Sequence, residues 1–95
     1  MADAEKLIKL FPQKEAALFV LARAQDANGQ SESAITLYNQ LISRYPDKAE
    51  YINNRGVIYF NKLKQYVEAK ADFEQAIRIN PTSGSYYLNL SRCYY

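Results

Sequence analysis

The side chains that most often carry out catalysis or bind metals are scarce in this sequence. Histidine is absent and Cys93 is the single cysteine, so the usual general base, an intramolecular disulfide and a cysteine–histidine zinc site are excluded. Glu68, Asp72 and Glu74 lie near one another, but carboxylates without other clustered ligands usually form the solvated side of a helix. Three scattered glycines cannot build a phosphate-binding loop. We therefore expect no enzyme activity, no metal and no cofactor.

Charge and length narrow the classes of partner. A net charge of +2 is too small for a phosphate-binding face, and the patch of Lys62, Lys64 and Lys70 has little aromatic interleaving, so no nucleic acid is expected. No apolar run approaches the roughly 20 residues that span a bilayer, which predicts no membrane partner. The first ten residues lack the apolar segment of a signal peptide. The chain is thus expected to be cytoplasmic if Met1 is the native start, and its compartment is otherwise unknown.

The three prolines divide the chain at nearly constant intervals. Pro12, Pro46 and Pro81 are 34 and 35 residues apart. The segment LIKLFP at the first proline matches LISRYP at the second in its Leu-Ile pair, its aromatic residue and its proline. Self-similarity at this period indicates stacked supersecondary units within one domain.

Each interval is predicted to hold two helices. Apolar residues follow helical spacing over residues 34–45, and Ser31 or Ser33 is expected to cap the start of this helix. The preceding helix is expected to stop at Asn28-Gly29, a pair typical of a left-handed cap. No segment alternates with period two, so no strands are predicted. The same plan recurs over residues 49–62 and 66–80.

Seven positions recur from unit to unit. In the second unit they hold Ile52, Arg55, Gly56, Tyr59, Ala69, Phe73 and Pro81. In the first unit the same places hold Leu18, Leu21, Ala22, Gln25, Ala34, Tyr38 and Pro46. The last stretch repeats the opening half with Tyr87, Leu90, Ser91 and Tyr94. This pattern resembles the tetratricopeptide repeat family, whose unit runs W-x2-L-G-x2-Y, then A-x3-F, then P.

The resemblance implies an all-α fold, a right-handed α-solenoid of antiparallel helix pairs with about six helices and no strands. Residues 1–95 would form one domain. Within it, residues 1–11 would be the second helix of a preceding repeat and residues 82–95 the first helix of a following repeat. Two full repeats would occupy residues 13–46 and 47–81.

Two features of the second unit depart from the family pattern. One extra residue lies between Tyr59 and Ala69, which predicts a longer or reshaped turn. Arg55 stands where the pattern has leucine, and a buried arginine needs a partner, for which Asp72 is the best candidate. Small residues such as Gly56, by contrast, fit the pattern because they allow two helices to approach closely.

The resemblance also implies that a peptide or partner subunit binds in a concave groove lined by the first helix of each pair. The first-helix residues that the family pattern leaves unused are the candidate groove residues. They are Phe19, Arg23, Asp26, Glu50, Asn53, Asn54, Val57, Phe60, Asn61, Ser85, Leu88, Asn89 and Arg92.

One subclass of the family grips a C-terminal carboxylate with a clamp of Lys, Asn, Asn, Lys and Arg. The equivalent places here hold Phe19, Arg23, Asn54, Ser85 and Asn89, of which only Asn54 matches. We therefore do not expect a chaperone-tail adaptor.

The alternative function is an architectural or self-associating scaffold segment without a peptide groove. The last helix is rich in tyrosine, and Tyr87 is expected to pack back on the preceding unit. Self-association through Tyr87, Tyr94 and Tyr95 would cover side chains that a following helix covers in a longer array.

Overall fold

The computed structural model describes residues 14–94, which form helices and no strand. The prediction of an all-helical chain is confirmed for these residues. The helix expected over residues 1–11 lies outside the described residues, as does Tyr95. The helices are α2 (Lys14–Ala27), α3 (Ser31–Arg44), α4 (Ala49–Asn61), α5 (Tyr66–Ile79) and α6 (Gly84–Arg92).

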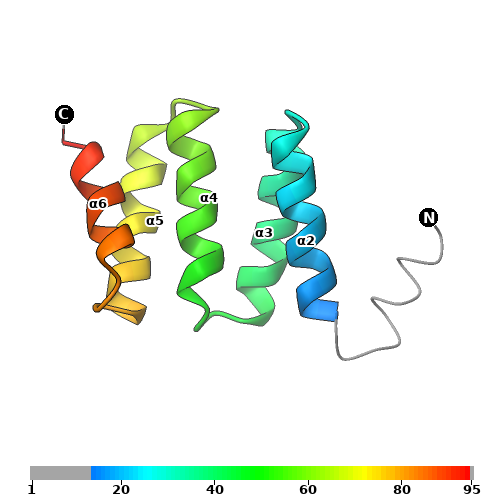
Figure 1. The fold of residues 1–95 in the computed structure, drawn as a ribbon, viewed down its shortest axis with the longest axis horizontal. Helices are drawn as coiled ribbons and strands as arrows, with labels where there is room; N and C mark the ends of the chain where they lie inside the picture. The colour runs from blue at the N-terminus through cyan, green and yellow to red at the C-terminus, as the bar shows by residue number, and fades with distance from the viewer. Residues whose placement is uncertain (1–13, 95) are drawn as a thin grey trace.

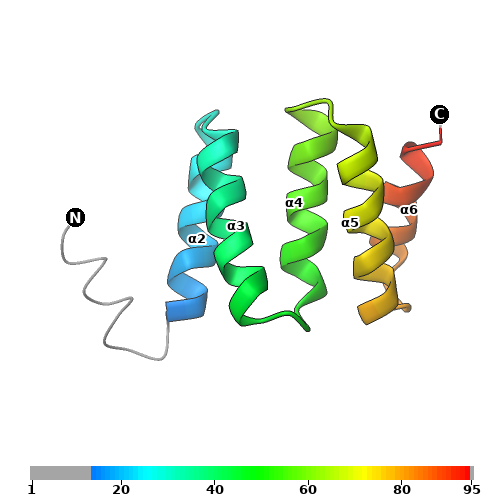
Figure 2. The ribbon, with the colours of Figure 1, turned by 180° about the vertical axis from the view of Figure 1, so that it is seen from behind.

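The helices stand side by side in chain order, and each packs on the next (Figure 1). Successive helices run in opposite directions, because a short turn joins the end of each to the start of the following one. Helices α2, α4 and α6 form the face seen in Figure 1, and α3 and α5 form the opposite face, seen in Figure 2. We call the first of these the α2/α4/α6 face.

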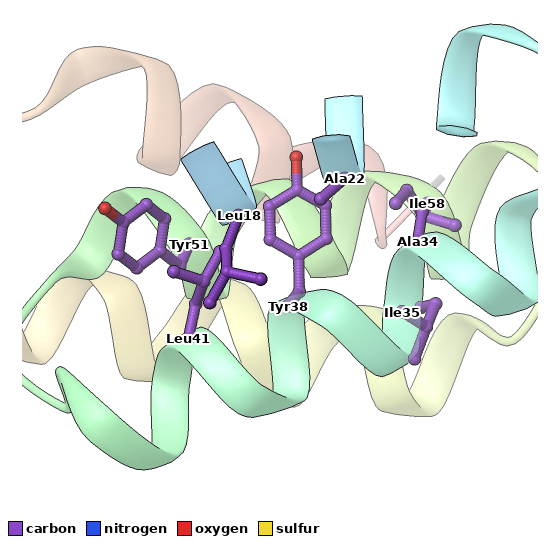
Figure 3. Packing of buried hydrophobic residues seen from close by; sticks show 8 residues of the cluster. All are labelled: Leu18, Ala22, Ala34, Ile35, Tyr38, Leu41, Tyr51 and Ile58. Carbon is purple, nitrogen blue, oxygen red and sulfur yellow. The ribbon is translucent and has the colours of Figure 1, made fainter. Parts of the chain in front are cut away.

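The main core crosses the boundary between the two predicted repeats. Side chains from α2, α3 and α4 meet in one cluster, shown in Figure 3. A unit of two helices could not bury these side chains alone, so α2 and α3 share this cluster with α4 of the next unit. The buried members are Leu18, Ala22, Ala34, Ile35, Tyr38, Leu41, Tyr51 and Ile58.

Gly56 permits the closest approach between α4 and α5. A Cβ atom at this position would lie 2.7 Å from Phe73 Cε1 and 3.0 Å from Asp72 Cβ. Ala69 of the same helix pair is fully buried. A larger side chain at Gly56 would force the two backbones apart, and the small residue therefore sets the spacing of this pair.

The two turns within the repeats differ in length and chemistry. Residues 28–30 join α2 to α3, and Gly29 there has φ +82°. Residues 62–65 join α4 to α5, so this turn is longer, as predicted. Lys64 takes the left-handed conformation here, with φ 56°. A non-glycine residue in this region carries a steric cost that Gly29 avoids.

The predicted serine cap of α3 is wrong. The helix begins at Ser31, with Gln30 in the N-cap position and no side-chain capping bond. Ser31 is buried instead of facing the free backbone N–H groups. The Gln30 N–H donates to Gln25 O at 2.8 Å, which draws the turn back onto α2, and the helix then begins earlier than a serine cap would place it.

Arg55 connects three helices. Its Nε donates to Asp72 Oδ2 at 2.8 Å and its Nη2 to Asp72 Oδ1 at 2.7 Å, which makes a two-pronged ion pair with the predicted partner. Its Nη1 also donates to Asn39 Oδ1 of α3 at 2.8 Å. The bonds to Asp72 raise the pKa of Arg55, and burial opposes the rise. The guanidinium therefore joins α4 to both neighbouring helices.

The tyrosines of α6 pack differently from the prediction. Tyr86, not Tyr87, contacts the smaller cluster of Ala49, Ile52 and Ala76. Tyr87 is 48% exposed. A shift of one residue turns a helical side chain by about 100°, so Tyr86 and Tyr87 lie on different sides of α6. The expectation for Tyr87 is thus wrong.

Candidate partner-binding face

A stripe of α4 side chains runs along the middle of the α2/α4/α6 face. Glu50, Asn54, Val57 and Asn61 follow helical spacing of four, three and four residues, which places them on one side of α4. Each is exposed or partly exposed. Since α4 stands between α2 and α6, this stripe can contact a ligand lying on either side of it.

A large hollow lies at the start of the stripe, between α4 and α6. Its volume is about 620 Å³, and it is an open depression whose walls are polar and apolar in nearly equal parts. Both helices begin here, and α5 ends here. The lining residues are Asp47, Lys48, Ala49, Glu50, Asn53, Asn54, Ile79, Asn80, Ser83, Ser85 and Tyr86.

A second hollow lies between α2 and α4. It has a volume of about 200 Å³ and is lined by Arg23, Asp26, Ala27, Tyr38, Asn54 and Val57. A pit of about 10 Å³ follows on the α6 side, lined by Val57, Phe60, Asn61, Phe73, Asn89 and Arg92. Asn54 belongs to the first two hollows, and Val57 to the last two. The three depressions therefore adjoin one another along α4 through shared lining residues, and we call them together the track.

Most of the predicted groove residues lie on this track, and two do not line it. Phe19 packs inside the face, with its ring centroid 5.2 Å from that of Tyr51 and 6.3 Å from that of Tyr38. Leu88 is exposed on α6 and is not among the residues that line the pit beside Phe60. Phe60 shares the pit with Phe73, and Leu88 takes no part in it.

Several polar groups of the track already have partners. Asn89 Nδ2 donates to Asn53 Oδ1 at 3.0 Å and ties α6 to α4. The Arg23 guanidinium lies over the Phe19 ring, 5.5 Å from its centroid. Lys62 Nζ and Asp26 Oδ1 are 3.6 Å apart, within ion-pair distance but beyond a hydrogen bond.

Tyr38 contributes a hydroxyl group that the sequence did not assign to the face. Its ring is buried in the core, and Figure 3 shows its hydroxyl pointing away from α3. Burial raises the pKa of Tyr38, and the carboxylates of Asp26 and Glu50 raise it further, against the opposing effects of Asn54 and Arg23. The hydroxyl therefore keeps its proton at neutral pH and can both donate and accept at the second hollow.

The side chains that line the track bear mainly amides, hydroxyls and charged groups. Residues 14–94 contain no group of three or more cysteine or carboxylate side chains placed to hold a metal ion. In the same part of the chain, no helix combines the length and apolar character needed to cross a bilayer. The polar groups of the track can donate and accept hydrogen bonds at several positions along α4.

Comparison with known proteins agrees with the helical pattern. A family model for the tetratricopeptide repeat matches residues 2–49 and, in a second placement, residues 19–84. The human protein named Protein O-mannosyl-transferase TMTC3 is 29% identical over 91 residues. That stretch covers 96% of this chain and 10% of the human protein, so the chain spans about a tenth of the length of this relative.

Proposed function

Because this chain belongs to the tetratricopeptide repeat family, we propose that it binds a peptide or a partner subunit across the α2/α4/α6 face. Repeats of this family generally mediate protein–protein interactions, and the family is typically not catalytic. The choice of this face as the binding groove is based on the residues that line the track.

The observation that supports the proposal is that the three depressions of the track adjoin one another along α4. One side of α4 lines the track with Glu50, Asn54, Val57 and Asn61. One hollow lies between this stripe and α6, and another between the stripe and α2. An extended peptide has a backbone N–H and C=O at every residue, and the amide of Asn54 can serve either group. Asn54 lines both larger hollows, so it would touch a peptide that crosses from one to the other.

Peptide selection on the purified chain tests the proposal. Peptides selected from a random library should bind the Asn54→Ala variant about fivefold more weakly than the original chain, since one hydrogen bond is lost. Arg92→Ala should weaken binding by a similar factor. Fluorescence anisotropy of labelled peptides measures both changes.

Gln40 supplies the matched control. It is exposed on α3, on the opposite face, and also bears an amide. Gln40→Ala should leave every affinity unchanged. Selected peptides that bind the Asn54→Ala and Arg92→Ala variants as tightly as the original chain would exclude this face as the site.

A self-associating scaffold is the second candidate function, and the exposed side of α6 favours it. Tyr87, Leu88 and Tyr94 are 48%, 57% and 62% exposed. Exposed large apolar side chains often mark a contact surface. Light scattering over a range of concentrations separates the two functions, because self-association raises the average mass with concentration and peptide binding does not require it.

A further inference from the structure

The charges along the track are separated by sign. At its first end, Asp47 and Glu50 both line the large hollow. Lys48 is the one cation among the described residues that line it, and its Nζ lies 3.8 Å from Glu15 Oε2. Two carboxylates therefore face one ammonium group, which itself pairs with Glu15, and this end of the track is negative.

The other end of the track is positive and aromatic. Arg92 lines the pit together with Phe60 and Asn61, and no carboxylate belongs to that lining. Arg92 has no ion-pair partner among the residues that the structure describes. The Phe60 ring lies 5.1 Å from that of Tyr66, centroid to centroid. An anionic side chain with an apolar neighbour would find both a cation and ring surface here.

The middle of the track is close to neutral. Arg23 and Asp26 face the same hollow with opposite charges, and Asn54 and Val57 carry none. At 1.5 Å per residue, α4 rises about 16 Å between Glu50 and Asn61. An extended peptide covers this distance in about five residues.

We propose, building on the proposed function, that the track binds an extended peptide of matching polarity. A basic side chain of the peptide lies at Asp47 and Glu50. An acidic side chain with an apolar neighbour lies about five residues away, at Arg92 and Phe60. The two charges fix the orientation of the peptide, because the opposite placement brings like charges together at both ends.

The charge pairs are solvent-exposed, so each contributes modestly to affinity. Exposed ion pairs correspond to changes of about two- to fivefold in binding. They act mainly on orientation and on the choice of partner. The contribution should shrink as salt is added, since exposed charges are screened within about 10 Å at 0.1 M ionic strength.

Double-mutant cycles on the selected peptides test this polarity. Glu50→Gln should weaken binding about threefold when the peptide carries its basic residue, and hardly at all when that residue is alanine. Arg92→Gln should behave in the same way toward the acidic residue. The control Glu68→Gln removes an exposed carboxylate from α5 and should change neither affinity.

The outcomes separate the two levels of the account. Coupling of Glu50 to the basic residue and of Arg92 to the acidic one would support the polarity. Two results would overturn the polarity and leave the proposed function standing. The peptides could need Asn54 and show no such coupling, or Glu50 could couple to the position of the acidic residue and Arg92 to that of the basic one. A library that yields no peptide dependent on Asn54 would overturn both.

Discussion

Replacement of Gly56 by leucine should destabilise the chain by about 3 kcal/mol, at the upper end of the usual cost of overpacking. Even the first carbon of the new side chain would lie 2.7 Å from Phe73 Cε1. Phe73 is among the most deeply buried side chains and has no room to withdraw. The collision therefore has to separate α4 from α5. Urea unfolding followed by circular dichroism measures the loss.

Gly84 gives the matched control for this substitution. It also lies in a helix, α6, but no atom lies within 4 Å of a Cβ placed there. Gly84→Leu should change stability by no more than about 0.5 kcal/mol, as is usual for an exposed site. Equal effects at Gly56 and Gly84 would show that the close approach of α4 and α5 does not limit residue size.

Replacement of Asp72 by alanine should also cost about 3 kcal/mol, because it leaves the Arg55 guanidinium without its two-pronged partner. The Asp72 side chain is 7% exposed, whereas the Arg55 side chain is 23% exposed. Water can therefore reach the arginine, which places the cost at the lower end of the range for broken buried pairs. Thermal or urea unfolding of the variant measures it.

A double-mutant cycle measures the interaction energy between Arg55 and Asp72 apart from their other contacts. Arg55→Leu restores the apolar residue of the family pattern, and combined with Asp72→Ala it removes both charges. The double variant should be more stable than the sum of the two single losses predicts, by about 1–3 kcal/mol. Glu68→Ala, an exposed carboxylate of the same helix, should have little effect. Additive losses would mean that the two side chains do not stabilise one another.

The helix order could be predicted because its signals are local. The helical period of apolar residues can be read within a short segment, and the prolines mark where the units end. Together these signals predicted the positions of α3, α4 and α5. The partner of Arg55 could also be predicted. A buried charge needs an opposite charge, and Asp72 lies on the next helix of the same unit. In each case a general physical requirement left few choices.

Other parts of the face depend on packing between helices, which the sequence alone does not specify. The bond from Arg55 to Asn39 and the bond from Asn89 to Asn53 each join helices whose relative rotation is set by the whole stack. The hydroxyl of Tyr38 reaches the second hollow because the ring passes between α2 and α4. The family pattern places Tyr38 in the core and does not predict where its hydroxyl lies.

The central claim is that a partner binds across the α2/α4/α6 face, and nuclear magnetic resonance tests it most directly. Titration of the labelled 95-residue chain with a selected peptide should shift the backbone signals of Glu50, Asn54, Val57 and Asn61 and of the facing residues of α2 and α6. Signals from the exposed side of α3 and α5, such as that of Gln40, should stay in place. Shifts confined to α3 and α5, with the α4 stripe unchanged, would contradict the account.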